Sequence, residues 1–257
     1  MYRIATLFSG SGGNAIFVDT GNAKLLFDAG KSTRAITNAL SELGVGLKEI
    51  DGVFITHEHV DHIGALPVLH KKISTPIHMT RASYENTALP PHDSFVLHPP
   101  VFCQRVGGTD VISFPTSHDS AMSVGYRIEW IDEEGHRHAI GIATDTGYVS
   151  DAVREGLMGC EAVVLEANHD PDMLMTGPYP YPLKMRILSR TGHLANEDCA
   201  AFSRYLAENG TRRLLLAHLS RENNTPQRAL SCVEKAVEGY GVILRVADPF
   251  SPVLLIP

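Results

Sequence analysis

The chain has 257 residues, of which 44% are hydrophobic and 20% charged, and its formal net charge is −7 at pH 7. This length allows a large buried core, and the ordinary hydrophobic content argues against intrinsic disorder. The acidic balance excludes a generally basic surface of the kind that coats nucleic acid, although it is compatible with a local basic face.

The sequence carries no signal for export or for membrane insertion. No apolar stretch approaches the roughly 20 residues that a membrane helix needs. The opening MYRIATLFSGSGG lacks the charged and then apolar layout of a secretory signal. The four cysteines form no CxxC pair, which favours thiols buried in a reducing compartment over disulfides or a zinc knuckle. We therefore expect a cytoplasmic protein without membrane contact.

The first part of the chain alternates short apolar runs with turn-forming stretches such as SGSGGN and TGN. We predict strands over 3–8, 15–19, 24–28 and 51–56. A first helix is predicted from the N-cap Ser32 to Leu43, with Gly44 as its stop signal. A second helix is predicted from Asp61 to about Leu69.

The second part continues the alternation. We predict strands over 111–115, 125–131, 138–143, 162–168 and 214–220, followed by two strands at the C-terminus. Helices are predicted over 151–158, 196–209 and 225–238, and a long loop rich in Pro and Tyr precedes His193. With no linker-like composition shift, we expect one domain over residues 1–257. Its class would be α/β (α+β), with two mixed sheets face to face and helices outside.

A dense group of metal-binding residue types follows the strand over 51–56, in FITHEHVDHIGAL. His57 and His59 are two apart at a strand end, so both side chains project to one face. Asp61 and His62 open the next helix, and a carboxylate there would neutralise part of a cation's charge. The zinc motif HExxH is excluded, because its fifth position is occupied by Asp61. We interpret the group as a metal site rather than a histidine-rich polar loop.

Two ions about 3.5–4 Å apart need more ligands than these four residues. Three further candidates follow apolar strands: His118 in FPTSHDS, Asp145 in IATDTG and His218 in LLLAHLS. A lone histidine after a strand is more often solvated or structural. Three such positions that complete two coordination shells are better explained together.

H-x-H-x-D-H, an isolated His, a TDTG turn and a late His together resemble the metallo-β-lactamase fold over essentially the whole chain. The resemblance implies a four-layer αββα sandwich and a structural role for Asp28 in LLFDAG. It also implies a hydroxide that bridges two ions. The implied ligands are His57, His59 and His118 for one ion, Asp61, His62 and His218 for the other, and Asp145 for both.

Within this fold the motifs favour the phosphodiesterase branch. Flavodiiron proteins carry Glu where His59 stands, and glyoxalase-type thioesterases place H-T-x-G-H where this chain has HDS and then SVGY. VVLEANHD and GHLANEDCA resemble the paired Glu and His of tRNase Z. The resemblance implies that the bridging hydroxide attacks phosphorus, that His193 protonates the leaving oxygen and that Glu166 orients His193. Asp61, His193 and Glu166 are thus the catalytic candidates.

Several separated segments, SGSGGN, LEANHD, GPYP, GHLAN and HLSRENN, resemble the WalJ (YycJ) group, regarded as exonucleases on double-stranded DNA. Only 73 positions separate Asp145 from His218, too few for the additional β-CASP domain of RNase J-like enzymes. The scattered cysteines also do not match the zinc site of PhnP-type phosphodiesterases.

Charge is distributed unevenly along the chain. Residues 181–230 hold eight basic and four acidic residues, so this segment is +4 in a chain of −7. Lys184, Arg186 and Arg190 lie in the predicted loop before His193 and are candidate phosphate contacts. The backbone of SGSGGN, with Ser11 and Asn14, is a second candidate phosphate cradle, although the stretch equally predicts a tight turn.

We therefore expect a two-metal phosphodiesterase or nuclease that uses Zn²⁺ or Mn²⁺, and a substrate that is DNA rather than RNA. Two alternatives stay open at this point. One is a hydrolase of a small cyclic phosphodiester or thioester, which needs the metals but no basic flank. The other is a non-catalytic metal-binding module, which needs neither His193 nor Glu166.

Overall fold

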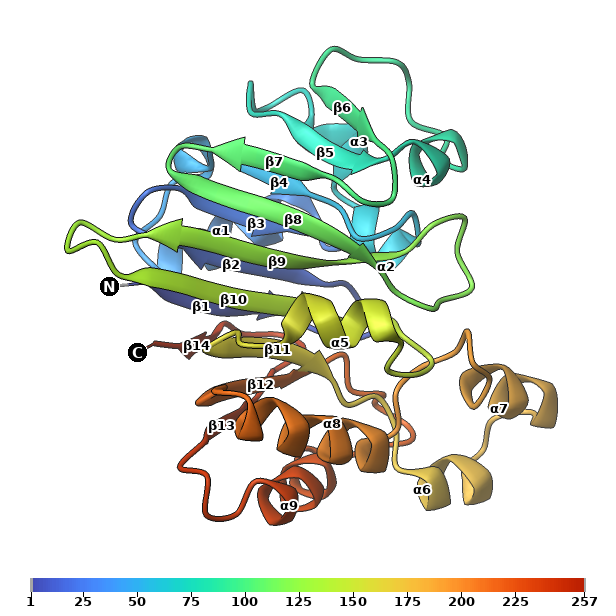
Figure 1. Ribbon diagram of the computed structural model, residues 1–257. Coiled ribbons are helices and arrows are strands. Elements are labelled where there is room, and N and C mark those ends of the chain that lie inside the picture. Colours follow the sequence, from blue (N-terminus) through green and yellow to red (C-terminus); the bar gives the residue numbers. More distant parts are fainter. Residues whose placement is uncertain (1, 257) are drawn as a thin grey trace.

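The computed structural model describes residues 2–256 and confirms the predicted αββα sandwich: two seven-stranded sheets face each other between outer layers of helices (Figure 1). In the first sheet the strand order is β14-β1-β2-β3-β4-β5-β6. Its strands are β1 (Arg3–Phe8), β2 (Ala15–Asp19), β3 (Lys24–Phe27), β4 (Gly52–Phe54), β5 (Ile77–Thr80), β6 (Phe95–His98) and β14 (Val253–Leu255).

The second sheet has the order β13-β12-β11-β10-β9-β8-β7. Its strands are β7 (Cys103–Val106), β8 (Thr109–Pro115), β9 (Val124–Ile131), β10 (Arg137–Ala143), β11 (Ala162–Glu166), β12 (Arg213–Ala217) and β13 (Ile243–Val246). Both sheets are mixed, since β3 to β6 and β10 to β13 pair in parallel and the other pairs are antiparallel.

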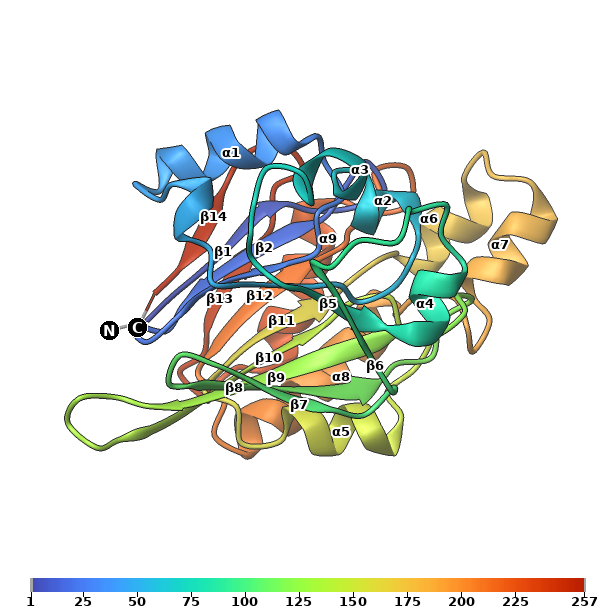
Figure 2. The ribbon, with the colours of Figure 1, turned by 90° about the horizontal axis from the view of Figure 1, so that it is seen from above.

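Three apolar layers hold the sandwich together, because each sheet has two faces to bury. The central layer lies between the sheets, where Phe27, Phe54 and Tyr126 pack together. Figure 2 shows α1 outside the first sheet and α5 and α8 outside the second. The helices are α1 (Thr33–Glu42), α2 (Val60–Ile63), α3 (Leu66–Leu69), α4 (Arg81–Glu85), α5 (Asp151–Leu157), α6 (Pro171–Thr176), α7 (Tyr181–Ile187), α8 (Asn196–Glu208) and α9 (Pro226–Ala236), with a 3-10 turn at Leu47–Glu49.

Parallel pairing places several strand ends together. In the register of β10, β11 and β12, Ala143 lies opposite Leu165, and Glu166 lies opposite Ala217. The residues that follow these strands therefore emerge at one edge of the second sheet. The carboxyl ends of β3 and β4 supply the corresponding edge of the first sheet.

The structure corrects the predicted elements in three places. The helix predicted from Asp61 to Leu69 is two short helices, α2 and α3, separated by Gly64 and Ala65. The loop predicted before His193 contains α6 and α7, which project beside the sandwich (Figure 1). The thiol prediction fails at Cys103, which is exposed, although Cys160 and Cys199 are buried. Within residues 2–256, no helix is both long enough and apolar enough to cross a membrane.

Candidate metal centre

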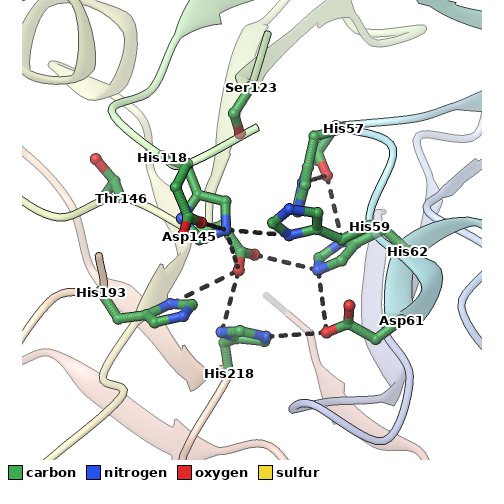
Figure 3. Close-up of polar contacts among 12 residues, drawn as sticks. His57, His59, Asp61, His62, His118, Ser123, Asp145, Thr146, His193 and His218 are labelled. Atoms are coloured by element: carbon green, nitrogen blue, oxygen red, sulfur yellow. Dashed lines mark hydrogen bonds and ion pairs between the residues drawn. The ribbon is translucent and has the colours of Figure 1, made fainter. Parts of the chain in front are cut away.

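Seven side chains from both sheets converge at the common edge of the sandwich (Figure 3). Their possible ligand atoms form three groups, and within each group the atoms lie within 4.8 Å of one another. The groups are His57, His59 and His118; Asp61, His62 and His218; and His57, His62 and Asp145. The structure thus brings together all seven residues that the sequence singled out.

Most of the histidine rings are fixed by a hydrogen bond on Nδ1. The Nδ1 atoms of His62, His118 and His218 lie 2.8 Å from Asp28 Oδ2, 3.0 Å from Gly192 O and 2.9 Å from Glu166 Oε1. His57 Nδ1 lies 3.0 Å from Thr56 Oγ1. A proton held on Nδ1 leaves Nε2 with a free lone pair, which is the arrangement that metal-binding histidines adopt. His59 differs, since its Nδ1 faces His118 Nε2 at 3.3 Å.

Three buried polar atoms in the centre have no hydrogen-bond partner: His57 Nε2, His218 Nε2 and Asp145 Oδ2. Buried polar groups are normally paired, so atoms left this way need an explanation. Imidazole nitrogens and a carboxylate oxygen are also the donors that Zn²⁺ and related divalent ions prefer. The residues present therefore fit a divalent metal site.

The backbone is strained at three residues of this edge. Asp28, Asp145 and His218 have φ values of 61°, 56° and 57°, and they are the three residues other than glycine with positive φ in the described chain. This conformation is costly for residues with a β-carbon and clusters at functional sites. Asp28 and His218 directly follow β3 and β12, and Asp145 is the second residue after β10, so the backbone turns each side chain out of the sheet at this edge.

The turn after β1 and the segment after β3 interlock with α2. Asn14 N donates to Asp61 O at 2.7 Å, and Gly30 N donates to Asn14 O at 2.8 Å. A β-carbon on Gly30 would lie 1.6 Å from Asp61 O, so only glycine allows this approach. The Asn14 side chain is buried and lies 3.1 Å from His62 Nε2, while its Oδ1 accepts from Gly10 N. Asn14 therefore supports the metal ligands, and the prediction that it contacts substrate is not supported by its position.

Glu166 links the metal centre to His193. Its Oε1 lies 2.7 Å from His193 Nδ1 and 2.9 Å from His218 Nδ1, and its Oε2 accepts from the backbone of Thr146 and Leu194. Glu166 is fully buried, whereas 21% of the His193 side chain is exposed. One carboxylate thus orients a candidate metal ligand and a candidate acid, and its contact with His218 had no signal in the sequence.

His193 and Glu166 stabilise each other's ionised forms. Burial alone would lower the pKa of His193, but the neighbouring Glu166 carboxylate outweighs it, and the pKa lies above its usual value. Burial likewise opposes ionisation of Glu166, yet His193 and His218 hold the pKa of this carboxyl well below its usual range.

A second metal arrangement is geometrically available, since ligand atoms of Asp145, Glu166, His193 and His218 also lie within 4.8 Å of one another. The hydrogen bonds argue against it. Both oxygens of Glu166 already accept N–H donors, and a carboxylate that binds the second nitrogen of a ligating histidine is a common outer partner of metal sites.

An open cavity of about 280 Å³ lies over the centre and is lined by His59, Asp61, His118, Asp145, His193 and His218. Ser11 and Arg186, two predicted substrate contacts, also line it. Arg186 pairs with Asp119, and Arg190 lies with its guanidinium carbon 3.8 Å from the centre of the Tyr148 ring.

Lys184 lies elsewhere. It is buried, and its ammonium group donates to Met175 O at 2.7 Å and to Gly177 O at 2.8 Å. These bonds hold the end of α6, so Lys184 is not available to a phosphate in this structure. The phosphate contact predicted for it is not supported.

Comparison with known proteins agrees with this architecture. Residues 23–219 match the model of the beta-lactamase superfamily domain. The chain is 35% identical over 247 residues to exodeoxyribonuclease YycJ of Bacillus anthracis, covering 93% of this chain and 91% of that protein. It is 36% identical to exodeoxyribonuclease WalJ of Streptococcus pneumoniae, covering 96% and 94%. The metallo-β-lactamase fold protein YhfI of Bacillus subtilis superposes with a TM-score of 0.74 at 16% identity, covering 98% and 99%.

Proposed function

The chain belongs to the beta-lactamase superfamily as a metal-dependent hydrolase, and from this premise we propose that it is a two-metal exonuclease that cleaves phosphodiesters of DNA. The observation that carries the proposal is the hydrogen-bonded unit of His193, Glu166 and His218 beside two groups of metal-binding side chains. The names of the two relatives, each an exodeoxyribonuclease, support DNA as the substrate class.

The side chains divide into two ligand sets with one shared member. His57, His59 and His118 would hold one ion, and Asp61, His62 and His218 the other. Asp145 would contact both, since its oxygens lie 3.3 Å from His62 Nε2 and 3.7 Å from His118 Nε2. Divalent ions at this place supply positive charge that polarises a phosphoryl oxygen and makes water more acidic. Zn²⁺ and Mn²⁺ are the ions we propose.

His193 acts on the leaving group in this proposal. Its Nδ1 donates to Glu166, which leaves Nε2 as the nitrogen that can face a substrate in the cavity. A water oxygen forms the new bond to phosphorus and loses a proton to solvent, while Nε2 transfers its proton to the sugar oxygen as the P–O bond to the sugar breaks. The neutral ring keeps the proton on Nδ1. A positioned acid of this kind accelerates departure of a poor leaving group by about 10²–10⁴-fold.

Leaving-group dependence tests this assignment. His193→Ala should lose about 10²–10⁴-fold in kcat/KM on DNA and far less on bis(p-nitrophenyl) phosphate, because p-nitrophenolate departs without a proton. Glu166→Gln should show the same pattern more weakly. Metal content and thermal unfolding should also be measured for each variant.

Two outcomes would contradict the role. If His193→Ala loses metal, His193 is a metal ligand, as in the alternative ligand group that contains Glu166. If both substrates slow equally while metal content holds, His193 is structural. Cys232→Ala, a substitution of a half-buried residue on α9 outside the cavity, serves as a control for general effects on folding.

A further inference from the structure

Two cationic side chains meet at the glycine-rich turn between β1 and β2. A β-carbon on Gly12 would lie 2.9 Å from Arg221 Nη2 and 3.3 Å from Lys31 Nζ. These nitrogens are therefore no more than about 6 Å apart. Lys31 comes from the segment between β3 and α1, and Arg221 follows β12. Three separate stretches of chain thus build one small positively charged surface.

Neither cation has an acidic partner in the described part of the chain. Within residues 2–256, no carboxylate oxygen comes within the 4.0 Å of an ion pair to Lys31 or Arg221. Arg186, Arg204 and Arg228, by contrast, each pair with a carboxylate. Two like charges held close together without a counter-charge repel each other, and an anion between them removes that repulsion.

Each cation lies over an aromatic ring. The guanidinium of Arg221 lies 4.6 Å from the centre of the Phe250 ring, and Lys31 Nζ lies 6.0 Å from that of Phe8. Cation–π contact orients the guanidinium plane without neutralising its charge. Gly12 has no side chain to separate the two cations, and its backbone does not require glycine, since its φ is not positive. The absence of a side chain at Gly12 leaves room for both cationic groups over this turn.

The pair adjoins the rim of the cavity over the metal centre through neighbouring residues, although neither Lys31 nor Arg221 lines that cavity. Ser11 and Ser220 both line the cavity over the metal ligands, and each is the sequence neighbour of a residue in the cationic surface. The wall that they form comes from different segments than the wall that contains Arg186 on α7. A nucleic-acid strand that crosses this rim with one phosphate in the cavity would bring a neighbouring phosphate towards Lys31 and Arg221.

We propose that Lys31 and Arg221 together bind one phosphate of the DNA strand, the neighbour of the phosphate that is cleaved. This inference rests on the proposed function. Successive phosphates of one strand are about 3.4 Å apart along the helix axis, so a substrate held at the metals places its neighbour a short distance away. A small diester has no such neighbour, so the pair would distinguish a polynucleotide from a small phosphodiester.

Charge-removing variants test the subsite: Lys31→Gln, Arg221→Gln and the double variant. Each single variant should raise KM for end-labelled DNA about tenfold. The double variant should reduce the slope of log K against log salt by about one, because both cations contact a single phosphate. Arg204→Gln on α8 removes the same charge as each single variant, is the matched control for them, and should leave both quantities unchanged. Turnover of bis(p-nitrophenyl) phosphate and metal content should stay at the wild-type level throughout.

Dinucleotides provide the sharper comparison. The wild-type protein should cleave one of pTpT and TpTp at least tenfold faster than TpT, since each adds a phosphate on one side of the scissile one. The double variant should lose that advantage. Equal rates on all three dinucleotides, or variants that match Arg204→Gln on DNA, would overturn the subsite. If the wild-type protein cleaves small diesters but not DNA, it is the proposed function that fails.

Discussion

Two neighbouring histidines, His78 buried and His98 half-buried, show how the fold controls protonation away from the metal centre. His78 Nδ1 lies 3.0 Å from His98 Nε2, and the two rings stack on Phe54 and Phe102. Burial, reinforced by the neighbouring His98, lowers the pKa of His78 from 6.5 to about 4. The pair is therefore neutral at neutral pH, with one ring donating to the other.

The lowered pKa of His78 should reduce the free energy of unfolding in mild acid. The unfolded chain binds a proton at His78 near pH 6.5 and the folded chain only near pH 4, so stability is fully present above pH 6.5 and is lost as the pH falls towards 4. The full difference is about 3 kcal/mol. Urea unfolding of wild type and His78→Asn, which keeps an N–H donor towards His98, should differ in pH slope over this range. Identical slopes would show that His78 is not the group responsible, and the exposed His136→Asn is the control.

At the scale of single residues, spacing and residue type were sufficient to find the centre. H-x-H-x-D-H and three later strand ends led to seven side chains that the structure places together. Contacts that depend on folded geometry were not accessible in the same way. The sequence could not indicate that Asn14 faces Asp61 and His62, or that Lys184 turns inwards, because both depend on backbone segments far apart in the chain.

Helix α7 carries one buried and one exposed basic residue on its two faces. Lys184 is buried and donates to two carbonyls at the end of α6, whereas Arg186 is exposed, pairs with Asp119 and lines the cavity. Spacing of two residues along a helix separates side chains by roughly half a turn. We propose that Arg186 and Arg190 contact DNA phosphates and that Lys184 only stabilises the α6–α7 lobe.

Substitutions separate these roles. Lys184→Met should leave two carbonyls unpaired, lower the free energy of unfolding by about 1–3 kcal/mol and affect DNA and small-diester hydrolysis alike. Arg186→Gln and Arg190→Gln should instead weaken DNA binding and flatten its salt dependence, with little change in stability. Calorimetry and binding titrations at several salt concentrations measure both. A selective DNA defect in Lys184→Met would contradict this division.

The elements that could not be predicted from the sequence share a physical cause. No element was predicted between residues 70 and 110, where β5, β6 and β7 are short and α4 has five residues. The α6–α7 segment contained usable signals, since Asp170 caps α6 and Pro171 occupies its first turn. A high density of proline and tyrosine favoured a loop, and short helices held by tertiary contacts carry little periodicity to oppose it.

At the scale of the whole molecule, the fold divides the centre between two sheets. The first sheet and α2 supply His57, His59, Asp61 and His62, and the second supplies the remaining three ligands. Alternating strands and helices predicted this sandwich, but strand order and the parallel register that brings β10, β11 and β12 to one edge needed the structure. A single domain over residues 1–257 stays a prediction, which one cooperative unfolding transition would support and two separate transitions would oppose.

We propose that this sandwich holds two metal ions and uses them to remove nucleotides from DNA. The most direct measurement loads the purified protein with Zn²⁺ or Mn²⁺, counts bound metal by elemental analysis and follows an end-labelled DNA duplex in the same sample. We expect close to two equivalents of metal, progressive shortening of the duplex from an end, loss of activity on chelation, and lower metal occupancy with Asp145→Ala. Metal content that stays at zero, or a two-metal protein that hydrolyses small diesters and leaves DNA intact, would contradict it.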